Sequence, residues 1–430
     1  MSLEQESQNR LILPSNRDAS GDDFVLKGDQ LQAPPFSEFP SPIIPTNPIL
    51  SWDSLRHRQP ARIPSILDAA GIDALFVTSG RMALALALKV IGISAGDVVL
   101  LPAYHCMSMV EPVAWSGACC DFYRICPDGS IDLEDIQSRL RSNTRLLVVA
   151  HYFGFPQPSK MIRDFCDRHG LVMIEDCAHA FFGEQDGQPL GFYGDYAIFS
   201  LMKFFPVFDG GCLTSTRHSL RRIHLGSAGM AFQFKTVLNT LEKAFVYRRL
   251  DVLRLLLALP FWLKDRLWRW LKSRQESGSE VRRSSPSASE GGFGFDAWWV
   301  DKHMSLFSRM TFDLTSRRRN VERRRSHFLR MLEAFDGLQG CAAVHKGLPE
   351  DVVPYVFPLR VDHPDPLFWN LRRSAAPVLR WEQLAPGVDA SIYPVSVDYS
   401  RHLIQIPCHQ ELTDQEVEWM IDVIQQEIRA

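Results

Sequence analysis

Short apolar, β-branched runs alternate with helix-like segments between about residues 70 and 215. This alternation is typical of βαβ units around a largely parallel sheet, whose strands are buried on both faces. The runs predict seven strands, over 74–79, 98–104, 120–125, 146–152, 171–176, 197–202 and 212–215. Helices are predicted over 82–91, 107–115, 133–140 and 160–169, and Asp132 is a suitable N-cap for the third.

The rest of the chain divides around this α/β region. Residues 1–60 are rich in Pro, Ser and Gln, which disfavours regular structure. A Ser-, Glu- and Arg-rich stretch over 273–290 has the composition of a flexible linker, and the amphipathic tail at 414–428 indicates a helix. We therefore expect an α/β protein of four parts: an extended or disordered arm over 1–60, a large domain over 61–230, a helical insertion and flexible linker over 231–290, and a smaller C-terminal α/β domain over 291–430.

Composition narrows the class of protein. With 430 residues, 46% of them hydrophobic and 23% charged, the chain can bury a large core and form two domains. Its net charge of −3 gives no electrostatic reason to bind nucleic acid. The nine cysteines are scattered, odd in number and without a CxxC pair, which indicates reduced thiols, a cytosolic protein and no structural metal site. Residues 1–23 are polar and acidic, so no signal peptide is expected.

A lysine, Lys203, follows the apolar run at 197–202 and precedes the glycine pair Gly210-Gly211. An ammonium group is seldom buried without a partner or a function. Burial lowers the pKa of a lysine and frees its amine to form an imine with an aldehyde. The alternative is a lysine whose ammonium group reaches solvent while only its stem is buried.

An acidic pair, Glu175-Asp176, ends the run at 171–176 and is followed by His179. Open α/β sheets bind ligands at the carboxyl ends of their strands, so we expect Asp176 to face a pocket. A carboxylate there can keep a pyridine nitrogen protonated, while His179 can contact a phenolic oxygen or orient Asp176. The alternative is a surface acid pair beside a half-buried histidine.

Two further strand ends carry residues that could hold a flat, phosphorylated ligand. Ser79-Gly80-Arg81 closes the first strand and opens a helix, whose free N–H groups and dipole favour a phosphate. The second strand ends at Tyr104 and His105, and either ring could stack on a flat cofactor. Taken singly, the Ser79-Gly80-Arg81 turn can be an ordinary helix cap, and Tyr104 and His105 can be aromatic residues that pack in the core. Combined with an amine and an anion, they meet the requirements of a pyridoxal 5'-phosphate (PLP) enzyme.

These residues, in this order, resemble the DegT/DnrJ/EryC1/StrS family, the PLP-dependent sugar aminotransferases of fold type I. That family carries a Ser-Gly-Thr loop, a Pro-x-x-x-aromatic loop, a His-x-x-Gly strand end, a Glu-Asp-x-Ala-(Gln/His) segment and a Lys followed by Gly-Gly. The counterparts here are 79–81, 102–106, 151–154, 175–179 and Lys203 with Gly210-Gly211. Arg81 departs from the usual Thr, and Cys106 stands where a stacking aromatic is common. The stacking group is therefore open between Tyr104 and His105.

The resemblance implies a large domain with a seven-stranded, mostly parallel sheet and a role for each motif. Lys203 would hold PLP as a Schiff base and shuttle protons, Asp176 would pair with the pyridine nitrogen, and His179 would lie near the ring oxygen. The residues implied at the phosphate are Ser79, Gly80, Arg81 and Ser200. In a branch of the family that dehydrates sugars, histidine replaces the lysine, whereas this chain retains Lys203.

The implied reaction is transamination from an amino acid such as glutamate to a nucleotide-linked keto-sugar, by a homodimer. It would serve glycan, polysaccharide or secondary-metabolite biosynthesis. Two other classes remain open: another PLP reaction on a non-sugar substrate, and a non-catalytic PLP-fold regulatory protein. Retention of both Lys203 and Asp176 favours an enzyme.

A basic stretch over 247–274 is not explained by these motifs. It contains eight basic and two acidic residues, a net charge of +6, interleaved with Leu, Phe and Trp. Such a stretch can lie peripherally on an anionic membrane surface. It can equally form a helical hairpin that covers the active site or a dimer interface.

Overall fold

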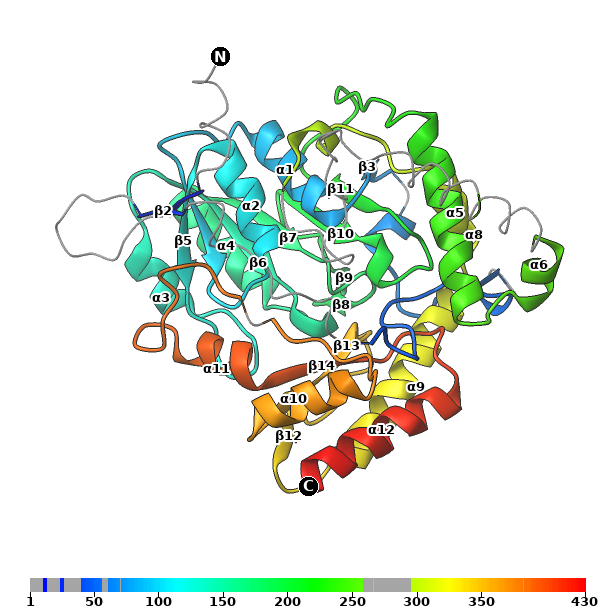
Figure 1. Cartoon of the computed structure of the whole chain (residues 1–430). Coiled ribbons are helices and arrows are strands. Elements are labelled where there is room, and N and C mark those ends of the chain that lie inside the picture. The colour runs from blue at the N-terminus through cyan, green and yellow to red at the C-terminus, as the bar shows by residue number, and fades with distance from the viewer. Residues whose placement is uncertain are drawn as a thin grey trace, which may run out of the picture.

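The computed structural model describes residues 11–13, 24–26, 40–55, 61–69, 71–257, 266, 295–381 and 383–430. Within them, a seven-stranded sheet of order β3-β11-β10-β7-β6-β4-β5 forms the centre of the larger part (Figure 1). Its strands are β3 (Asp73–Val77), β4 (Val98–Pro102), β5 (Cys119–Tyr123), β6 (Thr144–Ala150), β7 (Val172–Asp176), β10 (Tyr196–Ser200) and β11 (Gly211–Ser215). The seven strands predicted from the apolar runs are confirmed.

Parallel pairing dominates this sheet. Strands β10, β7, β6, β4 and β5 pair in parallel, while β11 runs antiparallel to both of its neighbours, β10 and β3. Every residue of β4 and β10 is buried, which is why these segments have continuous apolar runs and not an alternating pattern. The carboxyl ends of the parallel strands and the start of β11 meet at one edge of the sheet.

Four helices lie between these strands at the predicted positions: α1 (Gly80–Ile91), α2 (Met107–Ser116), α3 (Leu133–Arg139) and α4 (Ser159–His169). Ser79 caps α1 by accepting a hydrogen bond from the Met82 N–H. Asp132 caps α3 in the same way, as predicted, by accepting from the Asp135 N–H. Gly92 ends α1 with a φ of 76°, a left-handed conformation that glycine adopts without strain.

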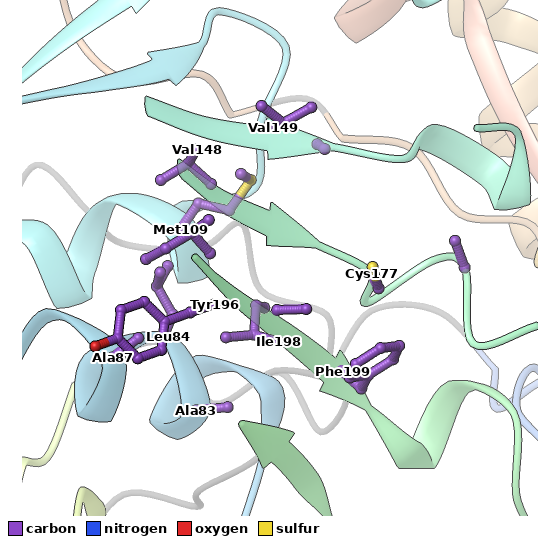
Figure 2. Close-up of a cluster of buried hydrophobic side chains, with 14 of the residues drawn as sticks. Ala83, Leu84, Ala87, Met109, Val148, Val149, Cys177, Tyr196, Ile198 and Phe199 are labelled. Carbon is purple, nitrogen blue, oxygen red and sulfur yellow. The ribbon is translucent and has the colours of Figure 1, made fainter. Parts of the chain in front are cut away.

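The core of the larger part lies between helices and sheet. Figure 2 shows Leu84 and Ala87 of α1 beside Tyr196 and Ile198 of β10, and all four side chains are buried. The small side chains of Ala83 and Ala87 let α1 lie close to the sheet, which brings its N-terminus to the carboxyl edge.

A smaller antiparallel sheet of order β12-β13-β14 lies nearer the C-terminus (Figure 1). Its elements and helices are β12 (Cys341–Ala343), β13 (Val356–Val361), β14 (Leu403–Pro407), α9 (Arg317–Phe335), α10 (Pro364–Arg373), α11 (Pro394–His402) and α12 (Asp414–Arg429). A separate apolar cluster includes Phe328, Phe357, Ile404 and Met420. The predicted fold class, a large mostly parallel sheet with a smaller C-terminal α/β unit, is confirmed, while the boundaries of the four predicted parts stay predictions.

Further helices connect the two sheets: α5 (Met230–Val246), α6 (Asp251–Leu256), the 3₁₀ turn η8 (Ala297–Trp299) and α8 (Leu306–Leu314). The sequence between 298 and 335 looks helical throughout, but α8 and α9 are separate helices. Ser316 causes the break, because its side chain accepts a hydrogen bond from the Arg319 N–H and starts a new helix. The predicted linker over 273–290 lies outside the described residues.

The shorter elements are β1 (Leu11–Leu13), β2 (Phe24–Leu26), β8 (Glu184–Gln185), β9 (Gln188–Pro189) and the 3₁₀ turns η3 (Asp53–Leu55), η4 (Ile66–Asp68), η5 (Tyr152–Gly154) and η6 (Leu201–Lys203). Within the predicted arm, β1 pairs with β2, and Ile44 packs into the second apolar cluster. In the described part of the chain, no helix has the length and apolar character needed to cross a bilayer.

Candidate active site

A pocket lies at the carboxyl edge of the seven-stranded sheet, where the loops that follow several strands converge. It is lined by Ser79, Gly80, Arg81, Leu84, Cys106, Ser108, Met109, Ala150, His151, Tyr152, Asp176, Ala178, His179, Ile198, Ser200, Met202, Lys203 and Trp381. Residues from the ends of β3, β4, β6, β7 and β10 thus meet in one place, as the parallel topology requires. All the predicted site residues line this pocket except Tyr104 and His105.

Lys203 reaches the pocket from the short turn η6, directly after β10. Its amine lies 5.3 Å from the centroid of the Tyr355 ring. Burial lowers the pKa of Lys203, and the negative charges that Cys106 and Asp176 can carry oppose this only in part. A lysine with a lowered pKa is more often neutral, and therefore nucleophilic, near pH 7.

Asp176, the last residue of β7, is 8% exposed and accepts a hydrogen bond from the Ala178 N–H at 2.8 Å. Burial raises the pKa of Asp176, while this hydrogen bond and the charge of Lys203 lower it in part. A further cation facing the carboxylate would lower that pKa more, because opposite charge favours the ionised form. The site thus offers an anion suited to a protonated ring nitrogen.

The neighbouring Glu175 is fully buried and serves the framework of the site. Its carboxylate accepts hydrogen bonds from the Gly194 N–H at 2.6 Å and from Ser159 Oγ at 2.8 Å. The Gln157 N–H donates to His151 Nδ1, which assigns the ring proton to Nε2, 2.9 Å from Glu175. Burial raises the pKa of Glu175, but His151 and these hydrogen bonds outweigh it and hold the pKa below its ordinary value. The network fixes the end of β6 against β7.

The first turn of α1 forms another side of the pocket, beside the residues at the ends of β7 and β10. A Cβ atom at Gly211 would lie 2.1 Å from the carbonyl carbon and oxygen of Ser79, so only glycine permits this approach of β11. Arg81 is buried and pairs with Glu111 of α2 at 3.2 Å. An anion at this helix N-terminus would therefore meet N–H groups, a hydroxyl and a guanidinium whose charge Glu111 partly balances.

Tyr104 and His105, the two predicted stacking residues, are fully buried behind the pocket wall. The His105 ring is stacked on Phe122, with centroids 4.8 Å apart and planes 13° from parallel. Its Nδ1 lies 3.1 Å from the Pro102 carbonyl oxygen, and its Nε2 accepts a hydrogen bond from the Ala385 N–H at 3.0 Å. Burial lowers the pKa of His105 to about 4, so the ring is neutral at pH 7.

Trp381 lines the pocket although no sequence motif indicated it. Its ring centroid lies 5.1 Å from that of Tyr104 and 5.2 Å from that of His179. The segment that carries it is held by the pairing of Leu379 with Gln405 and by the bond from Ala385 to His105. The one sequence signal that could have pointed to Trp381 was Cys106, which stands where a stacking aromatic is common. Cys106 does line the pocket.

These residues fit PLP, the cofactor that the motifs imply. The amine of Lys203 and the carboxylate of Asp176 share the pocket with the capped N-terminus of α1, which the close approach of Gly211 to Ser79 holds in place. This set supplies an amine for an aldehyde, an anion for a ring nitrogen and donors for a phosphate.

Comparison with known proteins agrees with the geometry. Residues 72–237 match the DegT/DnrJ/EryC1/StrS aminotransferase family. GDP-perosamine synthase of Vibrio cholerae is 32% identical over 142 residues, 32% of this chain and 39% of that protein. L-glutamine:2-deoxy-scyllo-inosose aminotransferase of Streptomyces kanamyceticus is 31% identical over 161 residues, 36% of this chain and 38% of that protein. The matched segment thus spans well under half the length of these relatives.

Solved structures extend the likeness in fold over most of the chain. DesV of S. venezuelae has a TM-score of 0.54 at 20% identity, and the match covers 83% of this chain and 85% of that one. Spr1654 of Streptococcus pneumoniae, in its PLP form, has a TM-score of 0.56 at 16% identity, with 83% and 87% covered. The chain therefore shares the fold of these solved structures, which is compatible with the predicted fold type I. The family match and the relatives confirm the resemblance predicted from the motifs: residues 72–237 of this chain are similar to the DegT/DnrJ/EryC1/StrS aminotransferase family.

Proposed function

We propose that this protein is a PLP-dependent aminotransferase that moves an amino group from an amino acid such as glutamate to a nucleotide-linked keto-sugar. The observation that carries the proposal is the single pocket shared by Lys203, Asp176 and the first turn of α1. These groups come from three strand ends far apart in the sequence. A purely structural role would not require a partly buried amine and a buried carboxylate to face the same space.

Bound PLP would supply an electron sink that stabilises negative charge on the substrate carbon bearing the amino group. Lys203 Nζ would be the amine that holds the cofactor aldehyde, and it would also be the base that carries a proton from that carbon. Its lowered pKa favours the neutral form that accepts the proton. Asp176 would hold a proton on the ring nitrogen through its negative charge.

His179 would help to bind the cofactor as a neutral side chain. Burial, with Lys203 nearby, holds the pKa of His179 well below its ordinary value, so the imidazole is neutral. A neutral ring can donate or accept one hydrogen bond at the cofactor's ring oxygen. The rings of Tyr355 and Trp381, with centroids 4.4 and 5.2 Å from that of His179, fix its orientation.

The names of the relatives support a keto-sugar acceptor. They include a GDP-perosamine synthase, a UDP-N-acetyl-3-dehydro-glucosamine aminotransferase, a dTDP-4-dehydro-sugar aminotransferase and an inosose aminotransferase. These names share cyclic, sugar-like acceptors. We accordingly propose a role in glycan, polysaccharide or secondary-metabolite biosynthesis.

The visible absorbance of the purified protein tests the proposal. After incubation with PLP, we expect a band from lysine-bound cofactor that shifts when an amino donor is added. Lys203→Ala should lack the band, whereas Lys89→Ala, which changes an exposed lysine of α1, should keep it. A protein that stays colourless would overturn the proposal. A coloured protein that forms no keto acid from any amino donor would favour another PLP reaction instead.

We also propose that the chain acts as a homodimer, as the family resemblance implies, and that it is cytosolic. All nine cysteines are free thiols, which fits a reducing compartment. Sedimentation velocity of the PLP-loaded protein tests the assembly: a dimer is expected, and a fully active monomer would contradict it.

Besides its substrates and a second copy of the chain, we propose that the protein contacts an anionic membrane surface peripherally, through residues 247–274. Val252, Leu255 and Leu256 of α6 are 64%, 75% and 73% exposed, next to the exposed Arg254. Apolar side chains beside basic ones suit a lipid interface. The protein should pellet with anionic liposomes and Leu255→Glu should pellet less, whereas no pelleting by the wild type would favour a hairpin within the protein.

A further inference from the structure

Arg324, in the middle of α9, is a fully buried arginine. Its five described hydrogen bonds all end on neutral carbonyl oxygens. The acceptors are Asn320 Oδ1 at 2.7 Å, Gln410 Oε1 at 3.0 Å, and the backbone oxygens of Pro354 at 3.2 Å, Tyr355 at 3.0 Å and Lys203 at 2.6 Å. A buried guanidinium is costly, so the pairing of all three of its nitrogens indicates a specific role for it.

One side of the guanidinium holds the backbone that carries Lys203. Nη2 donates to the Lys203 carbonyl oxygen, and the guanidinium carbon lies 4.3 Å from the centroid of the Phe204 ring. Asn320 and Gln410, which orient Arg324, both donate to the Phe204 carbonyl oxygen, at 2.6 and 2.8 Å. The carbonyl groups of Lys203 and Phe204, at the end of η6, are therefore fastened to α9 and to the turn that follows β14.

The other side of the guanidinium holds the start of β13. Nη1 donates to the backbone oxygens of Pro354 and Tyr355. The Tyr355 ring lies 5.3 Å from Lys203 Nζ and has its centroid 4.4 Å from that of His179. One side chain thus fixes both the lysine backbone and the aromatic ring against which the lysine amine lies.

We propose that Arg324 is a positioning residue for Lys203, which sets the direction of its amine in the pocket and couples it to the small sheet. This inference rests on the proposed function, since it assigns Arg324 a part in the work of the PLP lysine. A planar, five-donor guanidinium reaches three separate segments at once. A lysine ammonium has three donors on one atom and cannot span them.

The adjacent Arg325 provides a matched control. It lies on the same helix and donates to the backbone oxygens of Pro349 and Val352, but it does not reach Lys203. Arg324→Lys and Arg325→Lys both keep the charge and remove hydrogen bonds to carbonyl oxygens, five for Arg324 and two for the partly buried Arg325. Only the first change frees the backbone of Lys203.

The test uses the full chain, first without cofactor and then with PLP added, and measures how fast the visible band of lysine-bound cofactor appears. For Arg324→Lys we expect the rate at which the band appears to fall about tenfold or more. We expect kcat to fall about 100-fold with a much smaller change in KM, because displacing a catalytic group by about 1 Å costs roughly 100-fold in rate. Arg325→Lys should stay within about twofold in all three quantities.

If Arg324 had a purely structural role, Arg324→Lys would have a lower melting temperature. Below the thermal unfolding transition, however, the rate at which the band appears and kcat per bound PLP would be unchanged. That result would overturn the inference. If Arg324→Lys does not fold, Gln410→Met, which removes one acceptor of Nε, should show the same changes to a smaller degree. A Gln410→Met protein with wild-type rates would equally count against it. A wild-type protein without any band would instead overturn the proposed function.

Discussion

At the scale of single residues, a partly buried base, Lys203, and a buried acid, Asp176, share the pocket. Burial lowers the pKa of Lys203 and raises that of Asp176, so each is shifted toward its neutral form. A ligand with a protonated ring nitrogen would restore the charge of Asp176. The carboxylate is thus suited to a cationic ligand, while the lysine is suited to act as a nucleophile.

Asp176→Asn tests this assignment. The amide keeps the size of the side chain but cannot hold a proton on a ring nitrogen. We expect the band of lysine-bound PLP to form normally while kcat falls about 10²- to 10³-fold, the loss typical of one oriented electrostatic group. Asp128→Asn, on an exposed turn, is the control. Turnover by Asp176→Asn within a few-fold of the wild type would show that Asp176 does not face the ring nitrogen.

His105 makes the fold sensitive to acid. Its pKa is about 4 in the folded chain and about 6.5 when unfolded, so the unfolded chain binds the proton more tightly. The stability contributed by the neutral ring is complete above about pH 6.5 and is lost as the pH falls toward 4. Between pH 7 and pH 5 the loss should be about 2 kcal/mol.

Urea unfolding at pH 7 and pH 5 measures this loss. His105→Gln should be less stable than the wild type at pH 7, because the stacking on Phe122 is removed, but it should lose less on acidification. His169→Gln, at the exposed end of α4, should lose as much as the wild type. An equally acid-sensitive His105→Gln protein would show that other groups dominate.

At the scale of elements, the strands and the site residues at their ends were predictable because both leave local signals. A buried parallel strand is a continuous apolar run, and a polar residue such as Asp176 or Lys203 directly after it stands out. Glu111, Trp381 and Arg324 left no such signal. Their roles depend on contacts with α1, with the strand-end aromatics and with the lysine backbone, which lie far away in the sequence.

The position of the two predicted stacking residues outside the pocket lining has a related cause. Tyr104 and His105 follow β4 as a pocket residue should, but the chain turns so that Cys106 lines the pocket and both rings pack behind it. Periodicity gives the strand and its end, but not the direction of each side chain in the loop beyond it. In the same way, the break between α8 and α9 depends on one capping serine, Ser316, within a stretch of helical character.

The contact between β11 and α1 depends on one glycine. In Gly211→Ala the new Cβ would lie 2.1 Å from Ser79 backbone atoms, so the first turn of α1 must shift. We expect a loss of about 3 kcal/mol in the free energy of unfolding and weaker PLP binding. Gly347→Ala, where a Cβ meets nothing within 4 Å, should change neither quantity. Wild-type PLP affinity in a folded Gly211→Ala protein would argue against a phosphate site at this turn.

At the scale of the whole molecule, the N-terminal segment 40–55 joins parts that are distant in the sequence. Ile44 packs in the second apolar cluster, while Leu50 packs with Ala244, Phe245 and Leu250 in a third. His409 Nε2 lies 2.8 Å from the Pro45 carbonyl oxygen. The segment therefore links α5 to the small sheet and is part of the folded structure although its composition is that of an arm.

Glu411 is the polar centre of this connection. Its carboxylate is 3% exposed and accepts hydrogen bonds from Ser51 Oγ at 2.7 Å, Ser54 Oγ at 3.0 Å and Arg319 Nη1 at 2.7 Å. Glu411→Gln removes the charge that orients all three donors. Because hydrogen bonds to a charged group contribute about 1.5–3 kcal/mol, we expect the free energy of unfolding to fall by about 2 kcal/mol.

Urea unfolding and limited proteolysis together measure this effect. In Glu411→Gln, cleavage within 40–55 should become faster under native conditions, because the segment is released more often. Glu418→Gln is the control, since its pair with Arg330 is exposed and such pairs contribute about 0–1 kcal/mol. If Glu411→Gln lost stability without faster cleavage, the carboxylate would stabilise α9 through Arg319 alone. If both variants behaved alike, the N-terminal segment would be held by its apolar contacts, and Ile44→Asp would then release it.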